Sequence, residues 1–294
     1  MPPASPFTAP PRVTRAIALA EQHCPLCGAD CGWYHGTWPL WRALGIASTP
    51  VLHAAFYEEA IAEHLNAGGG MDVLVTGAAD PAMLATITGA FAARGRRPRL
   101  TVLDRCGTPL VLARDWAAVA DVELHTQRRN VLDAGGIGPF DLVCTHAFLG
   151  YFSPPARARL AIAWRSFLRP GGRLLTLNRL RPDAPYAPIG FSHEEARRFV
   201  ERARSEATAR HWDAQDTARR ARVWTEHFRQ WPVHTLEEVV TVLRAADFGV
   251  TTRAVQNDTG TTRGLSGPGT PGGARFAGFV GLAGCRGVGA RGPS

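Results

Sequence analysis

The sequence lacks a long apolar segment. No run of about 18 apolar residues occurs in it, and its start, MPPASPFTAPPR, is proline-rich and polar rather than a charged stretch followed by an apolar one. We therefore expect a chain that neither crosses a membrane nor carries an export signal, and that works in the cytoplasm. Internal repeats are also missing, so the 294 residues are expected to bury one large core, or one domain with a smaller appendage.

Lysine is absent as well, and all 33 basic side chains are arginine. With a formal net charge of +8, the chain favours an acidic partner, such as a phosphate, a carboxylate or RNA. Charge informs association rather than fold, however, and a GC-rich genome would produce the same replacement of lysine by arginine. The charge alone therefore leaves the class of partner open.

The cysteine spacing of a disulfide-bonded secreted domain is missing too. Three of the six cysteines cluster near the N-terminus, and the other three, Cys106, Cys144 and Cys285, lie alone in apparent strands. This arrangement excludes a disulfide framework and fits a reducing cytoplasm.

From Asp72 onward, short apolar runs alternate with helix-like stretches. The runs are DVLVTG, RLTVLD, DVELHT, FDLVCTH and GRLLTLN, and the helix-like stretches include PAMLATITGAFAARG and PPARARLAIAWRSFLR. The alternation predicts an α/β fold, in which helices cover both faces of a mostly parallel sheet and ligands bind at the carboxyl ends of its strands. After TLEEVVTVLRAA, a further helix, the segments FGVTTRAVQND and ARFAGFVGLAG predict a terminal hairpin around a glycine-rich loop at residues 259–273.

Changes in composition set the expected segment boundaries. Residues 1–12 and 285–294 are expected to be disordered tails, 13–70 a helical segment rich in Cys and Trp, 71–284 the α/β domain, and 191–230 a helical insertion within that domain. Ser192 and Glu195 have the spacing of a capping box, which marks the start of the insertion.

The phrase FDLVCTHAFLGYFSPPARARLAIAWRSFLRPGGRLLTLN and the acidic strand end TVLDR resemble the class I S-adenosylmethionine-dependent methyltransferases over roughly residues 71–284. The resemblance implies a Rossmann-like sheet of seven strands, mostly parallel with a terminal antiparallel hairpin, and a helical lid from the N-terminal segment and the insertion. It also implies methyl transfer from S-adenosylmethionine, with S-adenosylhomocysteine as product.

The first strand runs into the turn Gly77, Ala78, Ala79 and Asp80, where the resemblance places the cofactor. Small residues are needed there because a side chain would occupy cofactor space. The turn is degenerate, since only one glycine remains and Val75 replaces the usual acidic residue. Asp80 is expected to take the place of that acid. The absence of G-x-G-x-x-G makes a nicotinamide-dependent dehydrogenase a minor alternative.

Asp104 ends the second strand, where the resemblance implies an acid that accepts hydrogen bonds from both ribose hydroxyls. A surface carboxylate that caps the strand is the simpler alternative. Asn130 stands where relatives often have an aspartate near the adenine amino group, and its side-chain carbonyl can accept that bond. The resemblance also places Arg105, Val131 and Thr145 along the cofactor.

Methyl transfer needs mainly a positioned nucleophile and exclusion of water, with a general base only where the acceptor must lose a proton. His146 follows the fourth strand and suits such a base, although a histidine bonded to a backbone carbonyl gives the same pattern. Tyr151 and Phe148 have aromatic faces that attract a sulfonium, unless they are core residues. The candidate catalytic residues are His146 and Tyr151, and Phe148 and Asn178 are candidate substrate contacts, with a loop-initiating role as the alternative for Asn178.

The segment GWYHGTWPLWRALG precedes the sheet, as helices do that close over the site in the resembling family. Aromatic side chains at this density usually pack in a core. The more specific interpretation is a lid over an apolar or aromatic substrate, in which His35 and Trp38 are candidate substrate contacts.

The same segment carries Cys24, Cys27, Cys31 and His35, which together can complete a tetrahedral zinc site. Only three residues separate Cys27 from Cys31, far fewer than between the donor pairs of ordinary zinc fingers, so buried thiols that act as small hydrophobes are the alternative. The order of the cysteines differs from that of radical enzymes, so no iron–sulfur cluster is expected.

These features together predict a methyltransferase that acts on a small aromatic or polyfunctional metabolite. An RNA base methyltransferase with an N-terminal zinc knuckle is the runner-up, and a non-catalytic relative that binds the cofactor is the third alternative. Arginines of the insertion either pair with glutamates on helix surfaces or form a pocket for an anionic substrate. A homodimer is compatible with the sequence, which does not specify the oligomeric state.

Overall fold

The computed structural model describes residues 10–47, 49–255 and 275–283. The tails predicted for residues 1–9 and 285–294 and the loop predicted for 259–273 fall outside these ranges. Helix α1 (Pro10–His23) includes residues 10–12, which the sequence analysis assigned to a tail. Prolines suit the first turn of a helix because the N–H groups they lack have no helical partner there.

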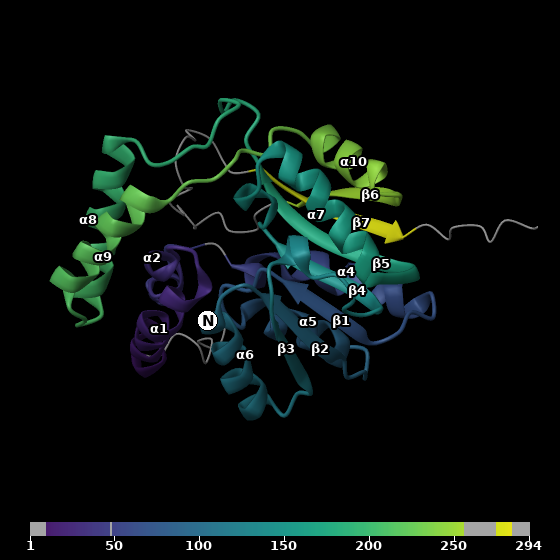
Figure 1. The fold of residues 1–294 in the computed structure, drawn as a ribbon. Coiled ribbons are helices and arrows are strands. Elements are labelled where there is room, and N and C mark those ends of the chain that lie inside the picture. The colour runs from purple at the N-terminus through teal and green to yellow at the C-terminus, as the bar shows by residue number, and fades with distance from the viewer. Residues whose placement is uncertain (1–9, 48, 256–274, 284–294) are drawn as a thin grey trace, which may run out of the picture.

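The strands form one seven-stranded sheet in the order β3-β2-β1-β4-β5-β7-β6 (Figure 1). Their bounds are β1 Asp72–Thr76, β2 Arg99–Asp104, β3 Leu124–Arg128, β4 Phe140–His146, β5 Leu168–Leu180, β6 Phe248–Val255 and β7 Arg275–Ala283. β7 pairs antiparallel with both β5 and β6, whereas the pairs among β1 to β5 are parallel. The predicted fold class and terminal hairpin are therefore confirmed.

One strand is shifted from its predicted position. The sequence analysis placed a strand over residues 121–126, but β3 begins at Leu124. The preceding helix α6 (Gly107–Ala120) ends at Asp121, which has the left-handed conformation with φ of 52°. A left-handed residue terminates a helix and cannot belong to a strand. The end of α6 therefore occupies the first predicted position of the strand, and β3 starts only at Leu124.

Helices cover both faces of the sheet, each over its own apolar core. On one face lie α4 (Ala54–Asn66), α5 (Ala82–Ala92) and α6, and on the other lie α7 (Pro154–Phe167) and α10 (Leu236–Ala245). β1 explains why both faces are needed, because Val73, Leu74 and Val75 are all buried and their side chains alternate between the two cores.

A third core joins two segments that are far apart in the sequence. The N-terminal segment contributes α1, α2 (Gly32–His35) and α3 (Trp38–Ala43), and the insertion contributes α8 (His193–Ala209) and α9 (Ala214–His227). The 3-10 turn η1 (Cys24–Cys27) links α1 to α2 and packs in a smaller cluster with Cys106. These helices lie side by side at one end of the molecule (Figure 1). Ser192 and Glu195 form the predicted capping box at the start of α8. We call the two segments together the lid.

Three further 3-10 turns complete the described elements: η2 (Pro50–His53), η3 (Val131–Asp133) and η4 (Leu149–Tyr151). Among the described residues, no helix has both the length and the apolarity needed to span a bilayer.

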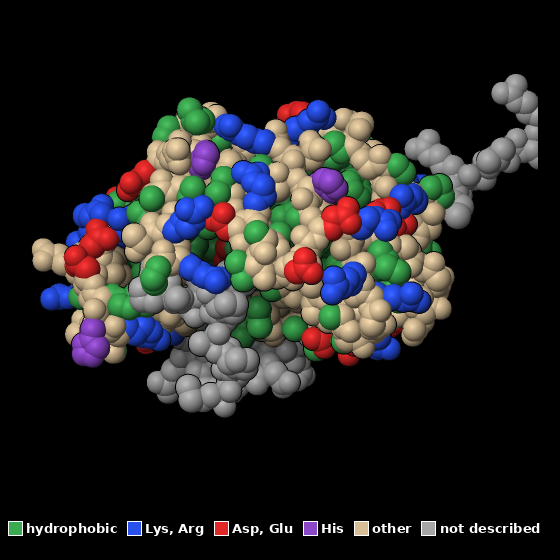
Figure 2. Space-filling model, turned by 90° about the horizontal axis from the view of Figure 1, so that it is seen from below, with side chains coloured by type: hydrophobic (Ala, Val, Ile, Leu, Met, Phe, Trp, Pro, Cys, Tyr) green, Lys and Arg blue, Asp and Glu red, His purple; other side chains and the backbone are tan. Residues whose placement is uncertain are grey.

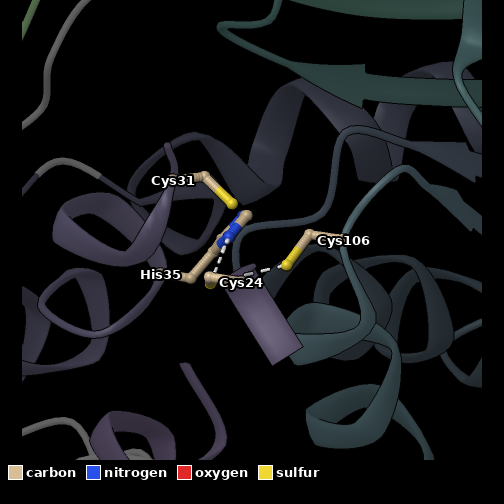
Figure 3. A group of neighbouring side chains, drawn as sticks. All are labelled: Cys24, Cys31, His35 and Cys106. Carbon is tan, nitrogen blue, oxygen red and sulfur yellow. Dashed lines mark hydrogen bonds between the residues drawn. The ribbon is translucent and has the colours of Figure 1, made fainter. Parts of the chain in front are cut away.

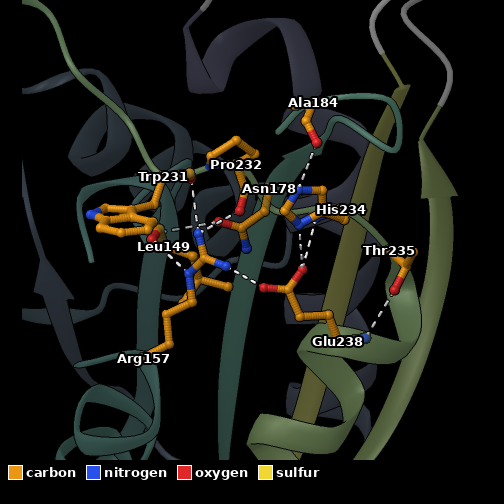
Figure 4. A network of polar contacts seen from close by, with 9 residues as sticks. All are labelled: Leu149, Arg157, Asn178, Ala184, Trp231, Pro232, His234, Thr235 and Glu238. Atoms are coloured by element: carbon orange, nitrogen blue, oxygen red, sulfur yellow. Dashed lines mark hydrogen bonds and ion pairs between the residues drawn. The ribbon is translucent and has the colours of Figure 1, made fainter. Parts of the chain in front are cut away.

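A buried arginine ties the lid connection to the sheet (Figure 4). Arg157 on α7 is 2% exposed, and its guanidinium pairs with Glu238 of α10. The same guanidinium donates to the backbone carbonyls of Leu149, Trp231 and Pro232 at 3.2, 2.8 and 2.8 Å. Leu149 follows β4, and the other two carbonyls belong to the segment that returns from α9 to α10. One side chain therefore positions both backbone segments.

Candidate active site

The carboxyl ends of β1, β2 and β4 lie beneath the lid, and Asp104 is the acid at the end of β2. Its Oδ1 accepts a hydrogen bond from the Cys106 N–H at 2.8 Å. Oδ2 has no hydrogen bond to any residue that the structure describes. Burial raises the pKa of Asp104 to about 6, against the opposing charge of the nearby His35. Asp104 therefore keeps one carboxylate oxygen for a hydroxyl donor, as the ribose prediction requires.

The turn after β1 is shaped differently from the expectation. Gly77 has φ of 70°, a conformation that favours glycine. A Cβ built on Gly77 would lie only 2.3 Å from the ring of Phe148. The small residue therefore makes room for Phe148, whereas the sequence analysis reserved that space for the cofactor and placed Phe148 beside the substrate. Ala78 is buried and Ala79 half-buried in the same turn.

Asp80 is half of an ion pair. Its Oδ1 accepts from the Ala82 N–H at 2.7 Å, next to Pro81, which is the N-cap of α5, and its Oδ2 lies 2.7 Å from Nη1 of Arg42 in α3. Both side chains are buried, and the Arg42 Nε has no hydrogen-bond partner among the described residues. The pair places a cation and an anion next to the β1 turn. A molecule with an ammonium and a carboxylate, such as the methionine part of S-adenosylmethionine, complements both charges.

The other predicted cofactor contacts lie around the same edge. Asn130 accepts from the Leu132 N–H at 3.2 Å and donates to Asp133 at 2.8 Å, so it caps η3 and retains one lone pair for an adenine amino group. Thr145 is buried at the end of β4, and its hydroxyl has no hydrogen-bond partner within the described ranges. Val131 is buried and Arg105 is exposed.

His146 lies in a small polar group with Tyr57 and His53. The Tyr57 hydroxyl donates to the Thr145 carbonyl at 2.9 Å and lies 3.1 Å from Nδ1 of His146. Because that hydroxyl has one proton, His146 donates through Nδ1–H and keeps the lone pair of Nε2. Burial and the neighbouring His53 lower the pKa of His146 to about 3. The imidazole is therefore neutral near pH 7, a weaker base than the sequence analysis expected.

Four rings from the lid and the end of β4 form what we call the aromatic lid cluster: Tyr34, Trp38, Tyr151 and Trp224. Tyr34 stacks on Trp38 and on Trp224, with centroid distances of 5.5 and 5.3 Å. Tyr34 also meets Tyr151 edge-on at 5.7 Å. Burial raises the pKa of Tyr34, and Tyr151, Asp80 and Asp104 raise it further. These contacts place the Tyr34 hydroxyl near both acids of the cofactor edge.

Asn178 has a structural position in β5. Its side chain is buried, accepts from the Leu149 N–H at 3.3 Å and donates to the Thr176 hydroxyl at 3.0 Å. These bonds hold the backbone after β4 in place. They argue against the substrate contact that the sequence analysis expected.

The predicted metal ligands come together in part (Figure 3). We call the group Cys24, Cys31, His35 and Cys106 the thiol–imidazole cluster; its donor atoms all lie within 4.8 Å of one another. Cys106 occupies the place that the sequence analysis gave to Cys27. Cys27 ends η1, and its thiol donates to the Ala29 carbonyl at 3.3 Å and lies 3.1 Å from the Cys31 sulfur. His35, also expected to contact substrate, belongs to this cluster.

Electrostatics within the cluster favour a thiolate. Hydrogen bonds with Cys24 and Cys31 lower the pKa of the Cys106 thiol despite its burial. Burial opposes protonation of His35, but hydrogen bonds with Cys106 and Cys24 outweigh it and raise the pKa of this imidazole to about 10.

Sequence reasoning missed four residues of the site: Arg42, His53, Tyr57 and Cys106. Arg42 was one arginine among 33, with nothing local to mark a partner 38 positions away. Tyr57 lies in a helix whose apolar spacing suggested only packing. Cys106 did carry a signal, because it follows the strand-end acid Asp104 by two positions, where ligands of a parallel sheet gather.

Three solved structures share the fold of this chain over most of its length. The S-adenosylmethionine-dependent methyltransferase SibL, in its apo form, matches 90% of this chain at 18% identity with a TM-score of 0.51. The Burkholderia thailandensis 1,6-didemethyltoxoflavin-N1-methyltransferase matches 94% of this chain and 92% of its own, at 18% identity and a TM-score of 0.51. An O-methyltransferase family protein from the same organism matches 94% of this chain and 67% of its own, at 14% identity and a TM-score of 0.52. The chain has the class I methyltransferase fold.

This chain and the three solved structures share the class I fold at low sequence identity. Low identity agrees with the loss of glycines from the turn after β1. No family model and no curated protein sequence matches the chain. The chain spans 62% of the SibL chain. Ligands of open α/β sheets bind at the carboxyl ends of the strands, and Asp104 and Asp80 lie at or just after the ends of β2 and β1, with Arg42 of α3 paired to Asp80.

Proposed function

We propose that the chain is a methyltransferase that uses S-adenosylmethionine to methylate a small molecule. The observation that carries the proposal is Asp104, which ends β2 of a class I fold with one carboxylate oxygen free of hydrogen bonds to the described residues. The Arg42–Asp80 ion pair beside the neighbouring strand supports it, because its two charges match the zwitterionic end of the cofactor. Arg42 Nε offers a buried donor with no described partner to the cofactor carboxylate.

The acceptor is proposed to be a small aromatic or polyfunctional metabolite. The aromatic lid cluster covers the cofactor edge with flat apolar faces, which suit a planar ring and exclude water. The similar N1-methyltransferase was solved with 1,6-didemethyltoxoflavin and S-adenosylhomocysteine bound. Its bound acceptor fits the proposal of a small aromatic substrate for this chain.

S-adenosylmethionine, when bound, would supply a methyl group on a positively charged sulfur. The nucleophile of the acceptor attacks the methyl carbon from the side opposite the sulfur, and the sulfur leaves with the electrons of the S–C bond. The chain's own residues then have two tasks: Asp104 and the Arg42–Asp80 pair hold the cofactor, and the lid positions the acceptor and excludes water. The neutral His146, which keeps its Nε2 lone pair, can accept a hydrogen bond from an acceptor N–H or O–H.

Replacing His146 separates binding from turnover. In His146→Ala, we expect turnover to fall about 100-fold, at the lower end for loss of a proton acceptor. Affinity for S-adenosylhomocysteine should stay unchanged, since Asp104 and Arg42 are intact. Initial-rate assays measure turnover, and calorimetry measures the affinity for S-adenosylhomocysteine. His125→Ala, which removes an exposed histidine from β3, is the control and should change neither. Unchanged turnover in His146→Ala would remove this residue from the chemistry.

Cofactor affinity should depend on pH through Asp104. Because burial raises the pKa of this carboxyl to about 6, it is ionised above pH 6 and protonated below it. The ionised form accepts better from ribose hydroxyls, so affinity for S-adenosylhomocysteine should fall by up to about tenfold per pH unit below 6. Calorimetry between pH 5 and 7 measures this slope. Asp104→Asn should bind more weakly, with affinity that is flat over the same interval.

Two observations weigh against RNA as the acceptor. Three of the four side chains of the thiol–imidazole cluster are buried, so the cluster is not an exposed knuckle. Arginine and acidic side chains are interspersed on the face shown in Figure 2. Much of the positive charge on the insertion is paired: Arg197 and Arg198 with Glu194, Arg210 with Glu206, and Arg219 and Arg220 with Asp216. Tight RNA binding that weakens steeply with salt would overturn this preference.

The position of Phe148 over Gly77 favours the second candidate, a non-catalytic relative. Calorimetry with S-adenosylmethionine separates the two, because the enzyme must bind it and therefore move Phe148 aside. Release of labelled methyl from the cofactor, measured against a panel of aromatic metabolites, tests the activity itself. Binding without methyl release to any acceptor would support the non-catalytic relative, and absence of binding would end both proposals.

A further inference from the structure

The thiol–imidazole cluster brings together donors from two separate parts of the chain. Cys24, Cys31 and His35 come from η1 and α2 of the lid, whereas Cys106 comes from the turn between β2 and α6. Figure 3 shows the four side chains converging from these elements. The class I fold does not need this convergence, because its sheet and helices are complete without the lid.

Two distances from the Cys24 sulfur match those of a tetrahedral metal site. With Zn–S bonds of about 2.3 Å, two sulfur ligands of a tetrahedral zinc ion lie about 3.8 Å apart, and a sulfur and a nitrogen lie about 3.6 Å apart. The Cys24 and Cys106 sulfurs are separated by 3.6 Å, and the Cys24 sulfur lies 3.7 Å from Nδ1 of His35. A disulfide would instead require about 2.05 Å between sulfurs. The spacing of Cys24, Cys106 and His35 therefore suits ligands around an ion, and Cys31 completes a group whose donor atoms all lie within 4.8 Å of one another.

We propose that the thiol–imidazole cluster is a zinc site that fastens the N-terminal part of the lid to the turn after β2. Three thiolates and one neutral imidazole form a Cys3His set, which is typical of structural zinc because it leaves no open position. Cys27, close to Cys31 but outside the set, is not a ligand.

The surroundings suit bound thiolates. Cys24, His35 and Cys106 are 3%, 7% and 0% exposed, so these three side chains are buried, whereas Cys31 is half-buried. The Thr108 hydroxyl donates to the Leu19 carbonyl at 3.3 Å and lies 3.4 Å from the Cys24 sulfur and 3.5 Å from the Cys106 sulfur, so it lines the cluster as a polar neighbour. Cys106 is also the N-cap of the 14-residue helix α6, whose positive end favours a thiolate.

An entry path exists beside the cluster. A cavity of about 510 Å³ lies between α1, η1 and α9, and its lining includes Cys24 and Cys31. A metal ion or a chelator can therefore reach the sulfurs without unfolding the sheet. All five described cysteines are free thiols, as zinc binding requires.

Metal content of the full-length chain, purified without chelator, tests the site. We expect about one zinc ion per chain by mass spectrometry, and loss of nearly all of it in Cys24→Ser and in Cys106→Ser. Cys27→Ser is the matched control, since it removes a neighbouring thiol that is not a ligand, and it should retain the zinc. Less than stoichiometric zinc in the wild-type chain would overturn the proposal. So would retention in Cys106→Ser together with loss in Cys27→Ser.

Cobalt exchange keeps the proposal testable if the serine variants do not fold. The wild-type chain, stripped by chelator and refilled with Co2+, should show the intense ligand-field and thiolate charge-transfer absorption of a tetrahedral site. The weak absorption of octahedral cobalt would contradict a Cys3His site. Neither readout depends on methyl transfer, so the zinc proposal and the proposed function can fail independently.

Discussion

Asp104→Ala is expected to weaken the binding of S-adenosylmethionine and S-adenosylhomocysteine by at least about 100-fold. The wild-type carboxylate has Oδ2 available for the ribose hydroxyls, while the Cys106 N–H fixes Oδ1 and therefore the orientation of the group. Two hydrogen bonds to a charged acceptor contribute about 3 to 6 kcal/mol, so their loss weakens binding by about 100-fold to 10,000-fold. Isothermal calorimetry on the full chain measures the dissociation constants.

The control for this experiment lies at the other end of α6. Asp121 is exposed and pairs only loosely with Arg97, at 3.6 Å, so Asp121→Asn removes a carboxylate without touching the cofactor edge. It should bind both compounds as the wild type does. Normal binding by Asp104→Ala would show that the ribose lies elsewhere and would remove the main support for the proposed function.

Arg157→Met is expected to lower the free energy of unfolding by about 3 to 5 kcal/mol, because it leaves Glu238 without its buried cation. The carbonyls of Leu149, Trp231 and Pro232 also lose their donor. Methionine preserves most of the volume, so the loss reports on the polar network rather than on a cavity. For a chain of this size, the melting temperature should fall by about 5 to 8 °C in a thermal scan.

Arg159→Met serves as the control on the same helix. Its side chain is 65% exposed and lies 3.8 Å from Asp133, so the change should stay within about 0.5 kcal/mol. If Arg157→Met and Arg159→Met had the same melting temperature, the network in Figure 4 would contribute no more stability than an ordinary surface ion pair.

The fold could be predicted because its signals are local. FDLVCTH and RLTVLD coincide with β4 and β2 to the residue, and Ser192 with Glu195 marks the start of α8. Apolar periodicity and capping act within one element, so the sequence displays them directly. The shifted start of β3 shows the limit, since the left-handed residue that delays it is an aspartate rather than a glycine.

The site was harder to predict because its partners are far apart in the sequence. Asp80 was identified as an acid near the cofactor, but its partner Arg42 lies on a different helix. Cys27 was included in the metal set because it is close in sequence, whereas Cys106 completes the set through the fold. Spacing along the chain predicts which groups are available, and only tertiary packing determines which of them meet.

The rings that join the two halves of the lid have a consequence for engineering. Tyr34 and Trp38 come from the N-terminal segment and Trp224 from the insertion; Tyr34 stacks on Trp224 across the boundary, and Trp38 lies tilted against the same ring. A graft of either half from another protein would leave those rings without complementary faces. Acceptor preference should therefore pass between homologous scaffolds only when α1 to α3 and α8 to α9 are transplanted as one matched unit.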